Sequence, residues 1–449
     1  MTSQRTISTA GRAAVCAGAI ALFLSTGACG NTLDVPNPQA FGEEDLNNPI
    51  ILKNVANGAE GALQLAYDNF IVVTELLSDE MESTSTWIDW EDISEGRVRA
   101  DWTLAGSFSD PQDQLLRARY AAQSAQERVE SVLGAAAATS PLRAQVVLVD
   151  ALADLLLATG YCESPLQPNA ARSPDIEVFK QAITKFTAGL AAAQAITGDD
   201  AAKTKWTNVA YAGRARANLM AGNYAAAKAD AQAVAVSFVY NAIYAEGATS
   251  TQSWTGQQFH QNRNRSGGLR RMYHARVHVI DSLGSGEAYL RDWLDPTKDD
   301  KRMAITRKAG QLGVNNRFAY FGITKYSDRA APIRMLSKTE SLLIEAEVAM
   351  RSNDYVTEAN ILNALRARGS VGLPPIPTPA SATEARNALL NERMAELFVE
   401  GSRENDLARF NLVRQILGPA RATKLPLSQN EVLNNSAMKV GEGSCPSIS

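Results

Sequence analysis

The chain has 449 residues, of which 45% are hydrophobic, and this is enough for a large folded core. Its net charge of −4 comes without a block of basic residues, which excludes the usual electrostatic basis of nucleic-acid binding. None of the three histidines pairs with a CxxC motif, so we expect neither a zinc enzyme nor a bound cofactor.

The first 28 residues have the pattern of a secretory signal peptide. Two arginines precede an apolar run over residues 13–24, which is too short for a membrane-spanning helix of about 20 residues. The small residues before Cys29 resemble a lipobox, so we predict cleavage after Ala28 and a lipid on Cys29; a plain secretory cleavage is the alternative. Prolines and asparagines predict an extended tether over residues 29–48.

From residue 49 to residue 449 the sequence predicts a single domain, whose first part, residues 49–235, is helical. Apolar residues recur there with helical spacing. The predicted helices cover residues 51–77, 112–133, 141–161, 175–196, 205–221 and 224–234.

Two pairs of predicted helices share a break of the same kind. The first pair breaks at residues 221–224 (AGNY) and the second at residues 352–355 (SNDY). Ala215 and Ala346 each lie nine residues before the tyrosine, where a small side chain lets two helices approach. This pattern is typical of a tetratricopeptide-like helical hairpin, although the two copies lie too far apart in the sequence for a tandem array.

Two segments, residues 78–110 and residues 236–331, lack helical periodicity and are rich in aromatic and polar residues. Long irregular segments inside compact domains are often functional. The candidate ligand-binding residues are therefore Trp254, Tyr273, Trp293, Trp87, Trp90, Gln257, Asn262 and Arg263. For any one of the aromatic residues, packing in the core is the alternative.

Cys162 and Cys445 are the cysteines that remain once the signal peptide and Cys29 are set aside. A secreted protein matures in an oxidising compartment, so we predict that these two form a disulfide.

Residues 391–406, NERMAELFVEGSREND, contain four glutamates at intervals of four residues: Glu392, Glu396, Glu400 and Glu404. On one helix they would share a face, where like charges destabilise unless they are paired. Gly401 is expected to end that helix. A glycosidase pair would need two carboxylates flanking a substrate groove. We therefore predict an ion-pair network with nearby arginines, for which the candidates are Arg366, Arg368, Arg393, Arg403 and Arg409.

The lipobox-like start, the hairpin at residues 221–224, the run over residues 324–355 and the segment over residues 389–410 together resemble the SusD/RagB family. We refer to residues 389–410 as the signature segment. The charged and glycine positions that match the family are Glu392, Arg393, Glu396, Glu400, Gly401, Arg403, Asp406 and Arg409. Two positions differ, because Glu404 and Asn405 stand where the family commonly has aromatic residues.

The resemblance implies a mostly α-helical fold, in which tetratricopeptide-like hairpins form a superhelical scaffold. Residues 236–331 would be an irregular ligand-binding insertion, and residues 332–449 would hold the C-terminal repeat helices and the signature segment. It also implies a nutrient-binding lipoprotein without catalysis, anchored in the outer membrane and facing outward. Such a protein would capture oligosaccharides, or peptides in some branches, for a TonB-dependent transporter of the SusC/RagA type.

Two other functions stay open from the sequence. One is a secreted helical glycoside hydrolase, for which Asp292, Asp295 and Asp299 are the only tempting cluster. The other is a tetratricopeptide-type scaffold that binds protein alone.

Overall fold

The chain divides into two compact units in the computed structural model, residues 1–48 and residues 49–449. The structure describes residues 42, 45–83, 88–98, 111–244, 275–277, 300–303, 305–312, 316, 319–323, 325–326 and 331–439. In the first unit, the described part contains one short 3-10 helix, η1 (Asp45–Asn47). The predicted signal peptide, the lipid on Cys29 and most of the tether lie outside the described residues and stay predictions.

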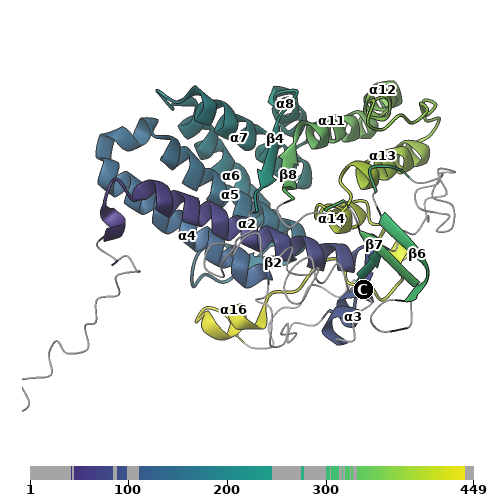
Figure 1. Cartoon of the computed structure of the whole chain (residues 1–449), viewed down its shortest axis with the longest axis horizontal. Helices are drawn as coiled ribbons and strands as arrows, with labels where there is room; N and C mark the ends of the chain where they lie inside the picture. Colours follow the sequence, from purple (N-terminus) through teal and green to yellow (C-terminus); the bar gives the residue numbers. More distant parts are fainter. Residues whose placement is uncertain are drawn as a thin grey trace, which may run out of the picture. The chain divides into compact units, whose positions relative to one another are not determined.

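The second unit is mostly helical, which confirms the expected fold class (Figure 1). The described helices before β4 (Val239–Ala242) are α2 (Leu52–Leu77), α3 (Ile88–Ser94), α4 (Pro111–Leu133), η2 (Gly134–Thr139), α5 (Pro141–Gly160), α6 (Asp175–Gln194), α7 (Asp200–Met220) and α8 (Tyr224–Ala233). The described helices after β8 (Ile333–Ser337) are α11 (Lys338–Arg351), α12 (Tyr355–Arg366), α13 (Ala382–Glu396), α14 (Arg403–Arg409), α15 (Val413–Leu417) and α16 (Gln429–Asn434).

Short antiparallel strand pairs connect distant parts of the second unit. The pairs are β1 (Met81–Ser83) with β5 (Ala275–Val277), β2 (Glu163–Pro165) with β3 (Arg172–Pro174), β4 (Val239–Ala242) with β8 (Ile333–Ser337), and β6 (Ile305–Leu312) with β7 (Ala319–Ile323). Four of these strands fall within residues 236–331, so the segment that lacks helical periodicity contains short strands. Strands of three to eight residues give too few alternations for their period to be recognised in the sequence.

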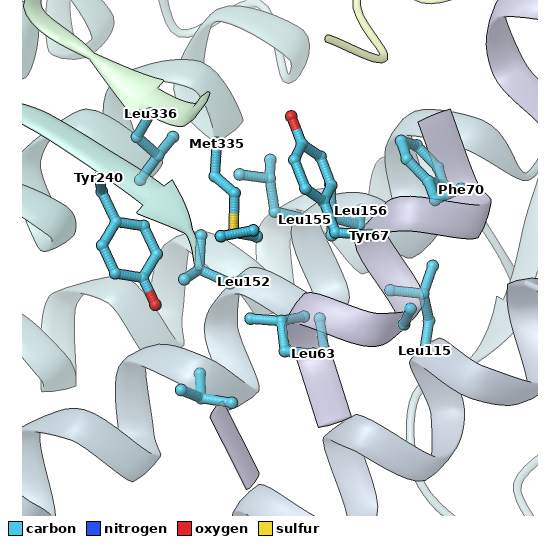
Figure 2. Close-up of a cluster of buried hydrophobic side chains, with 14 of the residues drawn as sticks. Leu63, Tyr67, Phe70, Leu115, Leu152, Leu155, Leu156, Tyr240, Met335 and Leu336 are labelled. Atoms are coloured by element: carbon cyan, nitrogen blue, oxygen red, sulfur yellow. The ribbon is translucent and has the colours of Figure 1, made fainter. Parts of the chain in front are cut away.

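The core is built around α5, whose residues from Ala144 to Gly160 are all buried. A helix that is apolar on most sides belongs in the centre of a domain, and the two buried aspartates of α5, Asp150 and Asp154, are paired with Lys185. Figure 2 shows leucines of α5 packed against Tyr67 and Phe70 of α2, with Met335 of β8 covering the cluster. Close approach of α6 and α7 requires a glycine, because a Cβ on Gly213 would lie 2.3 Å from the ring of Phe186.

The two predicted hairpins, α7–α8 and α11–α12, pack against one another through α8 and α11 despite their distance in the sequence. Ile344 of α11 lies in the same buried cluster as Ala215 of α7, which places a small residue at the contact. Arg216 of α7 donates from Nε to Glu340 of α11 at 2.5 Å, and both side chains are buried. The two hairpins are therefore neighbours in the folded structure although they are far apart in the sequence.

Candidate functional site

The signature segment forms two helices joined by a tight turn rather than one continuous helix (Figure 1). Because α13 ends at Glu396, the expectation that Gly401 ends this helix is wrong. Gly401 lies inside the turn with a φ of +74°, and Val399 has a φ of +55°. Left-handed backbone of this kind is strained for a β-branched residue such as valine. The four glutamates consequently do not share one helix face.

Glu392 and Glu396 of α13 are held by arginines from two parts of the chain. Arg302 donates from Nη1 to both carboxylates, at 2.8 Å in the case of Glu396. Arg366 and Arg368, which end the second hairpin, complete the pairs: Arg366 bonds to Glu392 and Arg368 to Glu396. These two arginines were among the expected partners, whereas Arg302 was not.

Glu400, in the turn, joins three further segments. Arg334 of β8 donates two bonds to its carboxylate, at 2.9 and 2.8 Å, and Lys325 donates a third at 2.7 Å. The hydroxyl of Tyr67 in α2 is placed to donate to the backbone carbonyls of Arg334, at 2.8 Å, and of Glu400, at 3.0 Å. The turn is thus tied both to the strand region and to the N-terminal helices.

The three arginines of the signature segment make bidentate pairs with other carboxylates. The pairs are Arg393 with Asp406, Arg403 with Asp79 and Arg409 with Glu347, at N–O distances between 2.7 and 3.1 Å. Although burial opposes the effect, Arg393 and Arg409 hold the pKa of Asp406 below its ordinary value. Bidentate guanidinium–carboxylate pairs fix geometry as well as charge. In the described part of the chain, these arginines are not the partners of the glutamate row.

Two buried carboxyl groups hold the strained turn through its backbone. Glu80 accepts a bond from the N–H of Val399 at 2.7 Å, and Glu75 accepts one from the N–H of Gly401 at 2.6 Å. Burial raises the pKa of Glu75 to about 7. Burial, together with the charge of Glu75, raises the pKa of Glu80 well above its ordinary value. Both shifts favour the protonated forms of these two carboxyl groups.

Glu404 of α14 differs from the other three glutamates of the row. It is 3% exposed, and neither of its carboxyl oxygens has a hydrogen-bond partner within the described residues. Burial raises the pKa of this carboxyl well above its ordinary value, which favours its neutral form.

The row does not have the geometry of a catalytic pair. Glu392, Glu396 and Glu400 are 1%, 4% and 6% exposed and are all engaged in ion pairs. Across the described part of the chain, no group of three or more His, Cys, Asp or Glu side chains is placed to hold a metal ion.

Most of the predicted ligand-binding residues lie outside the described residues. These are Trp254, Tyr273, Trp293, Trp87, Gln257, Asn262 and Arg263. Trp90 falls in α3, of which the backbone is described at that position. Cys162 is disulfide-bonded, but Cys445 lies outside the described part, so their pairing stays a prediction.

The structure does bring together the two segments that contain these candidates. β1 comes from the first segment and β5 from the second, and they pair with Met81 opposite Val277 and Ser83 opposite Ala275. The expected ligand-binding segments are therefore joined at this ladder.

A pocket of about 300 Å³ lies between α4, residues 165–168 and α16. Its exposed aromatic side chain is Tyr120, at 64%. We call it the Tyr120 pocket. Sequence reasoning missed it, although an aromatic residue on the polar face of the α4 pattern is a signal that could have been followed.

Among the described helices, none has both the length and the apolar composition needed to cross a membrane.

Residues 239–439 match the model of the SusD family, and this range contains the whole of α13, the turn and α14. The resemblance to the SusD family is confirmed. The charged signature segment that carried the resemblance in the sequence lies inside the matched range.

Solved SusD-like structures share this fold at low sequence identity. A SusD-like protein from Bacteroides fragilis is 13% identical, with a TM-score of 0.64 over 89% of this chain and 98% of that chain. A SusD-like carbohydrate-binding protein from Bacteroides vulgatus is 18% identical, with a TM-score of 0.59 over 80% and 83% of the two chains. A laminarin-binding SusD-like protein is 15% identical, with a TM-score of 0.58 over 85% and 98%. No curated protein matches the sequence.

Proposed function

We propose that this chain is a cell-surface lipoprotein that captures oligosaccharides and delivers them to a TonB-dependent outer-membrane transporter of the SusC/RagA type. The observation that carries the proposal is the SusD family match over residues 239–439, on a fold shared with SusD-like proteins described as carbohydrate binding and laminarin binding. A lipid on Cys29 would hold the protein at the outer membrane, facing outward.

The burial and the ion pairs of Glu392, Glu396 and Glu400 favour binding without catalysis. Ion-paired groups that are at most 6% exposed cannot reach a substrate, and an acid–base pair needs two carboxyl groups beside a groove. The helical hydrolase remains the second candidate, and its aspartates at positions 292, 295 and 299 lie outside the described residues.

The β1–β5 register supports a ligand face built from both aromatic segments. Ser83 ends β1 and Ala275 begins β5, and these two residues are paired. Trp87 follows Ser83 by four residues and Tyr273 precedes Ala275 by two. Both candidates therefore belong to the sequence segments that this ladder joins. We place Trp254 and Trp293 in the same ligand face on the strength of their composition alone.

The test is a binding measurement with the unlipidated chain, from residue 30 onward. Isothermal titration against a panel of neutral polysaccharides and oligosaccharides should show at least one ligand, with no hydrolysis of it. Trp254→Ala should weaken that binding by roughly ten- to a hundredfold, since a stacked aromatic contributes on the order of 1–3 kcal/mol by analogy with base stacking. The thermal midpoint should hardly change.

Trp206→Ala is the matched control, because Trp206 is 3% exposed and packs in the core beside Tyr240. This variant should lower the thermal midpoint and leave the affinity of the remaining folded protein intact. A Trp254 variant that behaves like the Trp206 variant would place Trp254 in the core. A chain that binds no member of the panel would contradict the proposed function.

A further inference from the structure

The Tyr120 pocket has walls that are bonded to one another. Asn430 of α16 donates from Nδ2 to Asp113 of α4 at 2.9 Å, and the N–H of Ser428 donates to Gln112 at 2.6 Å. On the other side, Arg119 donates to the carbonyl of Pro165 at 2.7 Å. These bonds hold α16 and residues 165–168 against α4, so the pocket exists before any ligand arrives.

The pocket combines an apolar floor with polar groups that face the open space. Leu116, Pro165 and Pro168 line it beside the ring of Tyr120. Polar lining side chains come from both helices and include Arg117, Gln123, Asn430 and Asn434. Within the described part of the chain, the Tyr120 hydroxyl and the Arg117 guanidinium make no hydrogen bond. They are therefore available to a ligand.

The charges in the pocket favour an uncharged ligand. Asp113 and Glu431 line it together with Arg117, while the second arginine, Arg119, is buried and paired with Asp154. An acidic ligand would meet two carboxylates and one available guanidinium, so its binding would be opposed.

A neutral sugar ring fits a preformed pocket, uses both its apolar and its polar lining, and carries no charge for the two carboxylates to oppose. Its C–H face would stack on Tyr120, and its hydroxyl groups would bond to the amides and to Arg117. The volume of about 300 Å³ lies at the lower end of the range of small-ligand pockets, which suits a short stretch of glycan rather than a long one.

We propose that the Tyr120 pocket is a carbohydrate subsite that binds part of a neutral polysaccharide. This inference rests on the proposed function, because it takes the ligand of the chain to be a glycan.

The experiment compares Tyr120→Ala, Tyr120→Phe and Trp254→Ala with the wild-type chain. The probes are laminarin, starch, xylan, galactomannan and inulin, and the measurement is isothermal titration. For each polysaccharide that the wild type binds, Tyr120→Ala should lower the affinity about tenfold or more. Tyr120→Phe, which keeps the ring, should stay within about threefold of the wild type. Because Tyr120 is mostly exposed, the thermal midpoints should agree.

Val356→Ala is the control for trimming an exposed side chain, since Val356 lies on α12 and is 59% exposed. It should leave every affinity unchanged. If Tyr120→Ala also leaves every affinity unchanged while Trp254→Ala weakens binding, the subsite is wrong and the proposed function stands. If the wild type binds none of the five polysaccharides, both are wrong. If Tyr120→Phe weakens the affinity as much as Tyr120→Ala does, the hydroxyl group makes the contact and the proposed stacking role is wrong.

Discussion

Buried carboxyl groups around the signature segment fall into two kinds, those with a cationic partner and those without. Glu400 is held by Arg334 and Lys325, whereas Glu404 has no partner within the described residues. Removing one partner of a buried ion pair leaves an uncompensated charge, but removing an unpartnered buried polar group removes a penalty. The two glutamates should therefore respond in opposite ways to the same substitution.

Glu404→Leu should raise the free energy of unfolding by about 1–3 kcal/mol, because a buried polar group without a bond costs about that much. Chemical denaturation at pH 7 measures the change. The expectation also agrees with the aromatic residues that the family commonly carries at this position.

Glu400→Leu is the matched control in the same segment. It should lower the free energy of unfolding by about 2–4 kcal/mol, somewhat less than for a fully buried pair because Arg334 and Lys325 are partly exposed to water. Destabilisation by both substitutions to a similar degree would mean that Glu404 has a partner.

The pair of Glu75 and Glu80 should make stability depend on pH. The pKa of Glu75 is about 7 in the folded chain, against 4.5 as its ordinary value. The folded protein thus holds this proton more tightly than the unfolded chain does. The resulting stabilisation is fully present below about pH 4.5 and is lost as the pH rises through about 7, by at most about 3 kcal/mol.

Glu75→Gln should flatten the wild-type slope of unfolding free energy between pH 5 and pH 8, since glutamine keeps an acceptor for Gly401 but does not titrate. Glu130→Gln is the control. Glu130 is paired with Arg143 at 2.9 Å, and although burial opposes it, this bond lowers its pKa, so its removal should not affect that pH range. A slope that survives Glu75→Gln would assign the titration to another group.

The helices show which elements could be predicted from the sequence and which could not. α2, α4, α5 and α7 lie within a few residues of the predicted ranges, because an amphipathic or apolar period of 3.6 residues is a local property. The end of α13 was missed because the glutamate spacing continues through the turn. What stops the helix is the pair of bonds from Glu75 and Glu80, and these come from the other end of the chain.

The candidate site was predictable in part for a similar reason. Aromatic and amide composition pointed to residues 78–110 and 236–331, but only the β1–β5 register shows that the two segments meet. Arg302, Arg334 and Lys325 could not be assigned to the glutamates from the sequence, because the pairing depends on strand geometry. The Tyr120 pocket was missed because its walls are brought together by the fold, with α4 and α16 about 300 residues apart along the chain.

The disulfide is a prediction about how the last residues are tied to the helical core. Cys162 directly follows Tyr161, which bridges to Leu425 near the end of the described chain. With Cys445 as the partner, Cys445→Ser should lower the free energy of unfolding by about 2–5 kcal/mol. Peptide mapping of the unreduced protein identifies the partner. Reduced wild-type protein serves as the control and should match the variant; a Cys162-containing peptide linked to any other cysteine would contradict the pairing.

At the scale of the whole molecule, the proposed lipid on Cys29 would set where the protein acts. Cys29→Ala should release the protein from the membrane fraction into the medium, because lipid chains supply the anchor in the proposed function. Fractionation with mass spectrometry of the N-terminus measures this, and Cys16→Ala, inside the signal peptide, is the control that should leave the anchor intact. Wild-type protein that is already unlipidated and free in the medium would contradict the anchor.

Asp79 and Arg403 are joined across 324 residues of sequence, and both are almost completely buried. The helices from α4 to α8 contact their neighbours along the chain and can associate as soon as they are made. The carboxyl groups near the end of α2 acquire these partners only when residues 399–403, near the end of the chain, arrive. Contacts of such long sequence separation form late, because the entropy of closing the loop is lost before the contact is gained. We therefore expect docking of the signature segment to be a late step of folding, and a chain cut short before it to expose the carboxyl-rich end of α2 to water.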